Sequence, residues 1–217
     1  MLTIYAVPVS VYNAKLRILL RHKGVPFSEQ PPPGGYGSAE YKSLVPSGNL
    51  PAMVHGDLIL ADSEAIAEYI EEAFPETPML PDTINLRAKA REKSRLHDTR
   101  LEPAVRAIYP NFAYDGRDAE AVKTGGATIS KHLQSLALFL ETDPLSSDTL
   151  WMCDCGFAVT FAWIRAFEEA LELPIDWPDA VLAYDARLRN HPVVAQELSQ
   201  YHAAMEAYLV KAKPPLP

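Results

Sequence analysis

The segment Leu50–Ile70, with the sequence LPAMVHGDLILADSEAIAEYI, constrains the fold more than any other part of the chain. Apolar residues begin a strand at Met53, and the pair Gly56-Asp57 is typical of a two-residue hairpin turn, with glycine where a positive φ is needed. Leu58–Leu60 then form a return strand. The pair Asp62-Ser63 is a helix start signal. The segment therefore predicts a strand, a turn, a second strand and a capped helix.

Pro51 opens the first of these strands, at a position where the strand ladder requires no N–H. An X-Pro bond is also the place where a cis peptide can turn the neighbouring backbone outward. We therefore expect the backbone next to Pro51 to face a small ligand.

The composition is that of an ordinary soluble globular protein. The chain has 217 residues, of which 48% are hydrophobic, so it can bury a substantial core in one large or two small domains. A formal net charge of -8 argues against nonspecific nucleic-acid binding, which draws on clustered Lys and Arg. No basic segment precedes an apolar one at the start, and no apolar run is long enough to span a bilayer. We therefore expect a cytoplasmic protein with neither nucleic acid nor membrane as a partner.

The two cysteines, Cys153 and Cys155, are too close in sequence to suggest a disulfide framework. Two thiols cannot form a four-ligand zinc site alone, and we expect no metal. Both cysteines are expected to be small buried side chains near a helix start.

The pattern of elements changes near Phe74. Before it, strands and helices alternate, which indicates an α/β unit. Its expected elements are a strand over 2–6, a helix over 11–23, a strand near Phe27, the hairpin, and a helix over 64–74. Prolines punctuate a linker after this unit, and nearly everything that follows has helical periodicity. We expect a first domain over 1–75, a linker over 76–83 and an all-α domain over 84–217.

The second domain contains several strong helix patterns. Residues 86–109 are expected to form one long helix with bends at Pro103 and Pro110, because a proline removes an internal hydrogen bond. The next helix is marked by Ile129, Leu133, Leu136, Ala137 and Leu140. Phe157–Leu171 is apolar nearly all round, which predicts the central buried helix. Pro178 and Pro192 suit first-turn positions of the last two helices.

Together these features resemble the glutathione S-transferase family. The likeness covers nearly the whole chain: the opening β-α-β of Leu2–Phe27, the VPSGNLP approach to Pro51, the Asp62-Ser63 helix start, and the run PDAVLAYDARLRNHPVV from Pro178. The resemblance implies a thioredoxin-like α/β domain that binds glutathione and an all-helical domain that contributes a second-substrate site. It also implies glutathione as co-substrate and a homodimer.

Ser10 is the candidate catalytic residue. A thiol with a pKa of about 8.5 is only a few per cent ionised at neutral pH, so a glutathione enzyme needs a donor and positive potential at the sulfur. A hydroxyl at a helix N-terminus supplies both, since the helix dipole and the free N–H groups favour negative charge. Counted back from the turn at Lys23-Gly24-Val25, Ser10 stands where the tau and zeta classes of the family carry their catalytic serine.

Other residues fit the position of the thiol less well. The classes that use a tyrosine have it where Ala6 falls in this chain, and Tyr5 is one residue off, so its side chain should point to the opposite face. No cysteine lies near Ser10, which disfavours glutaredoxin-like chemistry. Two alternatives remain open: Ser10 as a simple N-cap, and Tyr12 as the group that contacts the sulfur.

The resemblance assigns glutathione binding to Lys42, Asn49, Leu50, Pro51, Asp62 and Ser63. Ser63 is expected to cap its helix and take the γ-glutamyl carboxylate, while Asp62 faces the γ-glutamyl ammonium. The backbone N–H and C=O of Leu50 should pair with the cysteinyl residue like an added strand. Asn49 stands where related sequences often have Lys or Arg for the glycyl carboxylate, and Lys42 is its candidate substitute.

The second substrate is expected between the domains, near Ser10. The candidate aromatic walls are Tyr12, Tyr36, Tyr109, Phe112 and Tyr114, with Arg106 or Arg100 as anion partners. Core packing explains each of these aromatic residues equally well. The alternating basic run from Arg87 through Lys89, Arg91 and Lys93 to Arg95 is expected to be a solvated helix face or a dimer contact.

Two classes of function remain. One is a transferase that activates the glutathione thiol for attack on a small apolar or aromatic electrophile, as in detoxification. The other is a noncatalytic ligand carrier or assembly protein, because fold alone does not fix function. A glutathione-dependent isomerase or lyase is a further alternative, although the Ser-rich, Trp-Arg signature of the zeta isomerases is absent after Ser10. The combination of Ser10, Leu50-Pro51 and Asp62-Ser63 favours the transferase.

Overall fold

The computed structural model describes residues 1–113, 115–145 and 148–210. Two units can be distinguished, Met1–Leu80 and Pro81–Pro217. The first contains a β-sheet with helices, and the described part of the second contains helices only. The expected α/β domain followed by an all-α domain is therefore confirmed.

The first unit is organised around a four-stranded sheet with the order β2-β1-β3-β4. Its strands are β1 (Leu2–Tyr5), β2 (Phe27–Gln30), β3 (Ala52–His55) and β4 (Leu58–Ala61). β1 pairs with β2 in parallel, and β3 pairs antiparallel with both β1 and β4. Gly56 has a φ of 60° in the β3–β4 turn, so the hairpin is formed as its turn residues predict.

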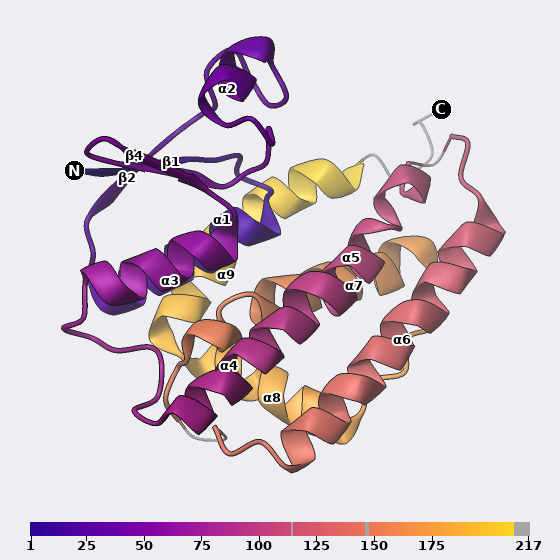
Figure 1. The fold of residues 1–217 in the computed structure, drawn as a ribbon. Coiled ribbons are helices and arrows are strands. Elements are labelled where there is room, and N and C mark those ends of the chain that lie inside the picture. The colour runs from indigo at the N-terminus through magenta and orange to yellow at the C-terminus, as the bar shows by residue number, and fades with distance from the viewer. Residues whose placement is uncertain (114, 146–147, 211–217) are drawn as a thin grey trace. The chain divides into compact units, whose positions relative to one another are not determined.

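Three helices accompany the sheet: α1 (Val11–Lys23), α2 (Ala39–Leu44) and α3 (Ser63–Ala73). α1 and α3 lie side by side on one side of the sheet, and α2 lies on the other (Figure 1). α1 ends at Gly24, whose left-handed conformation lets its N–H bond the last carbonyls of the helix.

The end of the first unit is held by a buried ion pair between α1 and α3. Lys23 Nζ lies 2.6 Å from Glu71 Oε2 and also donates to the carbonyl oxygen of Thr77 at 2.7 Å. The second carboxylate oxygen of Glu71 accepts the backbone N–H groups of Met79 and Leu80. These bonds fasten the first five residues of the expected linker, 76–80, to the first unit, and the division between the units falls directly after them.

The second unit consists of six α-helices and three short helical turns within its described residues. They are α4 (Ile84–Leu96), η1 (His97–Leu101), α5 (Glu102–Arg106), η2 (Tyr109–Asn111), α6 (Ala119–Glu141), η3 (Met152–Asp154), α7 (Phe157–Leu171), α8 (Asp179–Asn190) and α9 (Pro192–Leu209). The apolar α7 is buried along most of its length, as predicted. Pro192 is the first residue of α9, whereas Pro178 is the N-cap of α8, one position earlier than expected.

The expected long helix is present as a continuous run of α4, η1 and α5. The turn η1 is a wide π-turn, in which the N–H of Glu102 bonds the carbonyl of His97, five residues earlier. It lies directly before Pro103, which has no N–H to donate and whose ring crowds the carbonyl four residues back. The run ends at Arg106 rather than near Tyr109, which instead begins a short 3₁₀ turn.

Four of the five residues in the alternating basic run of α4 are exposed to solvent, as expected, but the expectation was wrong for Lys93. Residues two positions apart lie almost on opposite sides of a helix, so a run of this kind does not show which member turns inward. Lys93 is fully buried; its Nζ lies 2.9 Å from Asp143 and 3.0 Å from Asp154. Tyr184 donates to Asp154 at 2.6 Å, so this buried network joins α4, η3, α8 and the residues after α6.

Both cysteines are buried free thiols, as expected for small core residues. Burial raises the pKa of the Cys153 thiol well above its usual value, which keeps the thiol protonated at neutral pH. No helix among the described residues is both long enough and apolar enough to cross a membrane.

The Lys93 network generates a prediction about stability. Lys93→Met is expected to lower the free energy of unfolding by about 3–5 kcal/mol, because it leaves the buried Asp143 without its cation and Asp154 with only Arg187, 3.7 Å away. The measurement is denaturant unfolding followed by circular dichroism. Lys89→Met is the matched control: the same substitution on the same helix removes a half-exposed pair with Glu92 and should cost at most about 1 kcal/mol. Equal, small effects of both substitutions would contradict the assigned role.

Candidate functional site

Strand register brings three predicted site segments to one edge of the sheet. Ala52, the first residue of β3, is paired with Tyr5 at the end of β1 and with Ala61 at the end of β4. The loop after β1, the segment before β3 and the turn after β4 therefore leave the sheet at the same edge. These segments carry Ser10, Leu50-Pro51 and Asp62-Ser63.

The loop between β1 and α1 is held by a buried asparagine that the sequence did not single out. Asn13 is fully buried; its Oδ1 accepts the N–H of Val7 at 3.3 Å, and its Nδ2 donates to the carbonyl of Tyr5 at 3.2 Å. The N–H of Ala6 bonds the carbonyl of Gln30 on β2 at 2.9 Å. The loop that precedes Ser10 is thus fixed at both ends.

Ser10 is the N-cap of α1, with an extended backbone conformation and a half-buried side chain. Its Oγ accepts the N–H of Asn13 at 3.3 Å. Since that bond uses a lone pair of the hydroxyl, the hydroxyl proton remains able to point to an anion. The cap role and the proposed thiol contact are therefore compatible.

The side chain of Tyr5 packs against the cluster of Tyr41, Val45 and Ala52. Its ring packs edge-on against Tyr41, with 5.8 Å between ring centroids. Leu50 packs on the same cluster, so the expectation that Tyr5 lies on the opposite face from a ligand thiol stays a prediction.

The segment before β3 exposes a short stretch of backbone. The Leu50–Pro51 bond is cis, so the isomer considered from the sequence is the one found. Leu50 is half-buried and Asn49 is exposed. Among the described residues, neither the N–H nor the C=O of Leu50 has a hydrogen-bond partner. Both groups are therefore available to an extended peptide.

The turn after β4 corrects one sequence prediction. The N-cap of α3 is Asp62, not Ser63: Asp62 Oδ1 accepts the N–H groups of Glu64 and Ala65 at 2.9 and 3.1 Å. Two adjacent residues that can both cap a helix do not show from sequence which one does. Asp62 has a φ of 82°, a conformation that only tertiary constraints hold in a non-glycine residue. Ser63 is then the first helical residue and is 6% exposed.

A buried ion pair connects the two helices that start at this edge. Lys15 Nζ on α1 lies 2.6 Å from Glu64 Oε2 on α3. Lys15 is almost fully buried, and the Glu64 side chain is 12% exposed. The pair fixes α1 against α3 one turn below Ser10 and beside Asp62. Nothing in the local sequence indicated it, because the partners are 49 residues apart.

Lys42, the candidate for binding the glycyl carboxylate, lies close to the loop that contains Asn49. Its side chain packs over Gly48, where an added Cβ would lie 3.1 Å from Lys42 Cε. Gly48 also has a φ of 68°, so both its conformation and this contact favour glycine. The ammonium group of Lys42 is exposed within reach of the loop that contains Asn49. Among the described residues, no group of three or more His, Cys, Asp or Glu side chains is arranged to hold a metal.

The second-substrate candidates fall in both units. In the first unit, Tyr12 is half-buried on α1 and Tyr36 is 68% exposed. In the second, Arg106 binds Glu102, one turn away, through two hydrogen bonds, so an anion would have to share this guanidinium with a carboxylate. Tyr114 lies outside the described residues.

Tyr109 and Phe112 belong to an aromatic cluster of the helical unit. Tyr109 is half-buried against Trp163 and Phe167, with ring centroids 5.3 Å apart in both pairs. Burial raises the pKa of Tyr109 far above its usual value. Phe112 is 1% exposed and packs on Phe167 and Tyr208. This burial argues against direct substrate contact by Phe112; its aromatic character is explained by core packing.

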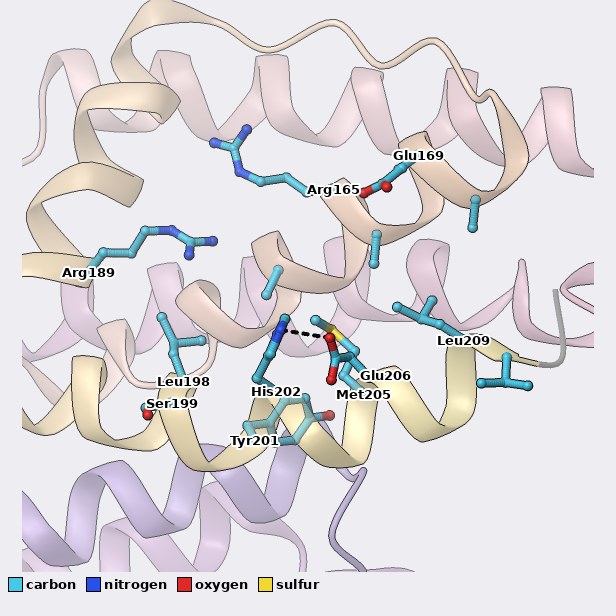
Figure 2. Close-up of a pocket in the computed structure, with 14 residues that line it drawn as sticks. Arg165, Glu169, Arg189, Leu198, Ser199, Tyr201, His202, Met205, Glu206 and Leu209 are labelled. Atoms are coloured by element: carbon cyan, nitrogen blue, oxygen red, sulfur yellow. Dashed lines mark ion pairs between the residues drawn. The ribbon is translucent and has the colours of Figure 1, made fainter. Parts of the chain in front are cut away.

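The helical unit also contains a groove between α7 and α9, with a volume of about 990 Å³ (Figure 2). His202 pairs with Glu206 inside it at 3.1 Å. Arg165 and Arg189 line it while both bind Asp185, at 2.9 and 2.8 Å. None of the residues predicted to bind glutathione or the second substrate lines this groove.

Comparison with known proteins agrees with this arrangement. A family profile described as "Glutathione S-transferase, N-terminal domain" matches residues 4–78. "Glutathione S-transferase 1" of Dianthus caryophyllus is 33% identical over 112 residues, which are 50% of this chain and 51% of that protein. The chain thus spans about half the length of that relative. "Stringent starvation protein A homolog" of Coxiella burnetii is 31% identical over 160 residues, 72% of this chain and 73% of that protein.

A solved structure shows the same fold over most of the chain. The holo structure of maleyl pyruvate isomerase, described as a bacterial glutathione S-transferase of the zeta class, matches with a TM-score of 0.76 at 23% identity. The match covers 90% of this chain and 95% of that one. With the three backbone segments at one sheet edge, these findings place the chain in the glutathione S-transferase family.

Proposed function

We propose that this protein is a glutathione transferase, which binds glutathione at the sheet edge of the first unit and activates its thiol as a thiolate. The observation that carries the proposal is the shared register of Tyr5, Ala52 and Ala61. Because of this register, three segments leave the sheet at one edge: one with a hydroxyl at a helix start, one with open backbone groups and one with a second helix start. A thiol peptide bound there would have the hydroxyl at its thiol, the open backbone segment along its own backbone and the second helix start at its carboxylate.

The interactions that Ser10 and the start of α1 can make with a thiolate are strong enough to activate the thiol. Lowering a thiol pKa by about two units requires about 2.7 kcal/mol. A hydrogen bond to a charged group contributes about 1.5–3 kcal/mol, and the helix N-terminus a further ~0.3–1 kcal/mol. Ser10 at the start of α1 supplies both, so no additional cation is needed at the sulfur.

The remaining parts of glutathione are assigned by charge and reach. Ser63 binds the γ-glutamyl carboxylate through its hydroxyl and its own N–H, because the next two N–H groups of α3 already donate to Asp62. Asp62 caps the helix through Oδ1, which leaves Oδ2 for the γ-glutamyl ammonium. Leu50 pairs with the cysteinyl backbone, next to Pro51. Lys42, with Asn49, serves the glycyl carboxylate.

The second substrate is proposed to be an apolar or aromatic electrophile. Tyr12 and the exposed Tyr36 are the aromatic contacts that the first unit offers, and the substrate contacts from the second unit remain a prediction. The alternative is a noncatalytic member of the family, since one relative is named as a stringent starvation protein homolog. A glutathione-dependent isomerase is a further alternative, because the fold is shared with maleyl pyruvate isomerase. Turnover with a panel of electrophiles separates these candidates.

Glutathione binding is tested by isothermal calorimetry on Ser63→Ala. We expect affinity to fall at least about tenfold, because a charge-assisted hydrogen bond is lost. Asp62→Asn should also weaken binding while leaving the helix capped, since Asn keeps an acceptor oxygen. Ser43→Ala, which removes an exposed hydroxyl bonded to the carbonyl of Glu40, is the control that should bind normally. Unchanged affinity in both site variants would remove this site.

The role of Ser10 is tested by titrating the thiolate absorbance of bound glutathione against pH. In Ser10→Ala the thiol pKa should rise toward the free value of about 8.5, and the acid limb of the rate profile should move to higher pH with it. Ser10→Thr keeps both the hydroxyl and the N-cap, so it should retain most of the activation. If Tyr12→Phe shifts the thiol pKa and Ser10→Ala does not, the assignment belongs to Tyr12.

We also propose that the protein is a homodimer, because family members generally pair two chains and cyclic dimers are the commonest oligomers. Sedimentation at micromolar concentration should give a species of about twice the 24.0 kDa chain mass. A single species at the chain mass would exclude this assembly.

A further inference from the structure

The peptide unit between Asn49 and Leu50 is held from one side by Tyr41. The phenol of Tyr41 donates to the carbonyl oxygen of Asn49 at 2.7 Å. That carbonyl belongs to the same planar unit as the Leu50 N–H. Leu50–Pro51 is the only cis bond among the described residues, so the Asn49–Leu50 unit is trans. In a trans unit the C=O and N–H point in opposite directions.

The direction of one group therefore fixes the direction of the other. Because the Asn49 carbonyl points at the Tyr41 hydroxyl, the Leu50 N–H points away from it. The N–H of Asn49 itself is turned to the exposed side, where it bonds Ser47 Oγ at 3.3 Å. Leu50 thus presents an N–H that no described residue accepts, directly before β3.

The surroundings of Tyr41 keep its hydroxyl protonated, so that it remains a hydrogen-bond donor. Its side chain is fully buried, in a cluster with Val45 and Ala52 against which Leu50 packs. Edge-on contact with Tyr5 fixes the plane of its ring. Burial, with the nearby Tyr5 and Tyr36 phenols, raises the pKa of Tyr41 to about 12, so the hydroxyl stays protonated across the working pH range.

We infer that Tyr41 is a positioning residue for glutathione: its hydroxyl orients the Asn49–Leu50 peptide so that the Leu50 N–H faces the cysteinyl residue. This inference rests on the proposed function. It adds a residue on α2 that touches no ligand, but determines whether the backbone of the binding segment is pre-aligned. Without the hydroxyl, the carbonyl loses its partner and the peptide unit is free to rotate.

The test compares Tyr41→Phe with Tyr69→Phe in the full-length protein. Both remove one hydroxyl from the first unit, and Tyr69 bonds His55 at 2.8 Å, away from the binding segment. Tyr41→Phe should raise the KM and the Kd for glutathione about fivefold, the equivalent of one ordinary hydrogen bond, with kcat and the bound-thiol pKa unchanged. Tyr69→Phe should leave all four quantities at the parent values.

If the parent binds glutathione and Tyr41→Phe binds it equally well, the inference is wrong while the proposed function stands. If the parent does not bind glutathione, the proposed function fails.

Discussion

The antiparallel pairing of β3 between β1 and β4 is the constraint on which the candidate site depends. It places the end of β1, the start of β3 and the end of β4 in one row, through Tyr5, Ala52 and Ala61. A slip of one residue would reverse every side chain of β3 and displace Leu50 from the edge. The hairpin turn at Gly56 fixes the register of β3 against β4. The burial of Met53 in the apolar core fixes which face of β3 points inward. The strand pairing thereby brings the segments that carry Ser10 and Ser63 to the same edge of the sheet.

A site made of unpaired backbone N–H groups needs rigid support. Without that support, each N–H could gain free energy by rotating toward another acceptor in the protein. Three buried polar side chains supply that support here. Asn13 fixes the loop before Ser10, Tyr41 fixes the peptide before Pro51, and Lys15 joins the two helix starts through Glu64. Each of these side chains satisfies its own hydrogen bonds inside the protein. The groups left open are those at the half-exposed edge, where water or a ligand can reach them.

The helical unit is organised by a different buried polar cluster. Lys93 faces two carboxylates, Asp143 and Asp154. Although burial alone would lower the pKa of Lys93, Asp154 and Asp143 raise it above the ordinary lysine value, so the ammonium stays charged. Close packing next to this cluster is equally strict: a Cβ at Gly156 would come within 2.4 Å of the His97 ring. Small residues and buried charges in this unit therefore determine how α4 and η1 pack against η3 and the residue that precedes α7.

The sequence by itself determined the features that depend on near neighbours in the chain. The hairpin at Gly56, the start of α1 at Ser10 and the buried helix Phe157–Leu171 follow from turn chemistry, capping and periodicity, which act over a few residues. Tertiary structure decided the choice of Asp62 over Ser63 as cap, the burial of Phe112, and the partners of Tyr41 and Lys93. Lys93 and Asp143 are 50 residues apart, and no local pattern records that pairing. Burial is a property of what the rest of the chain places around a residue, so a basic residue in an alternating run gives no sign of whether water or a carboxylate will surround it.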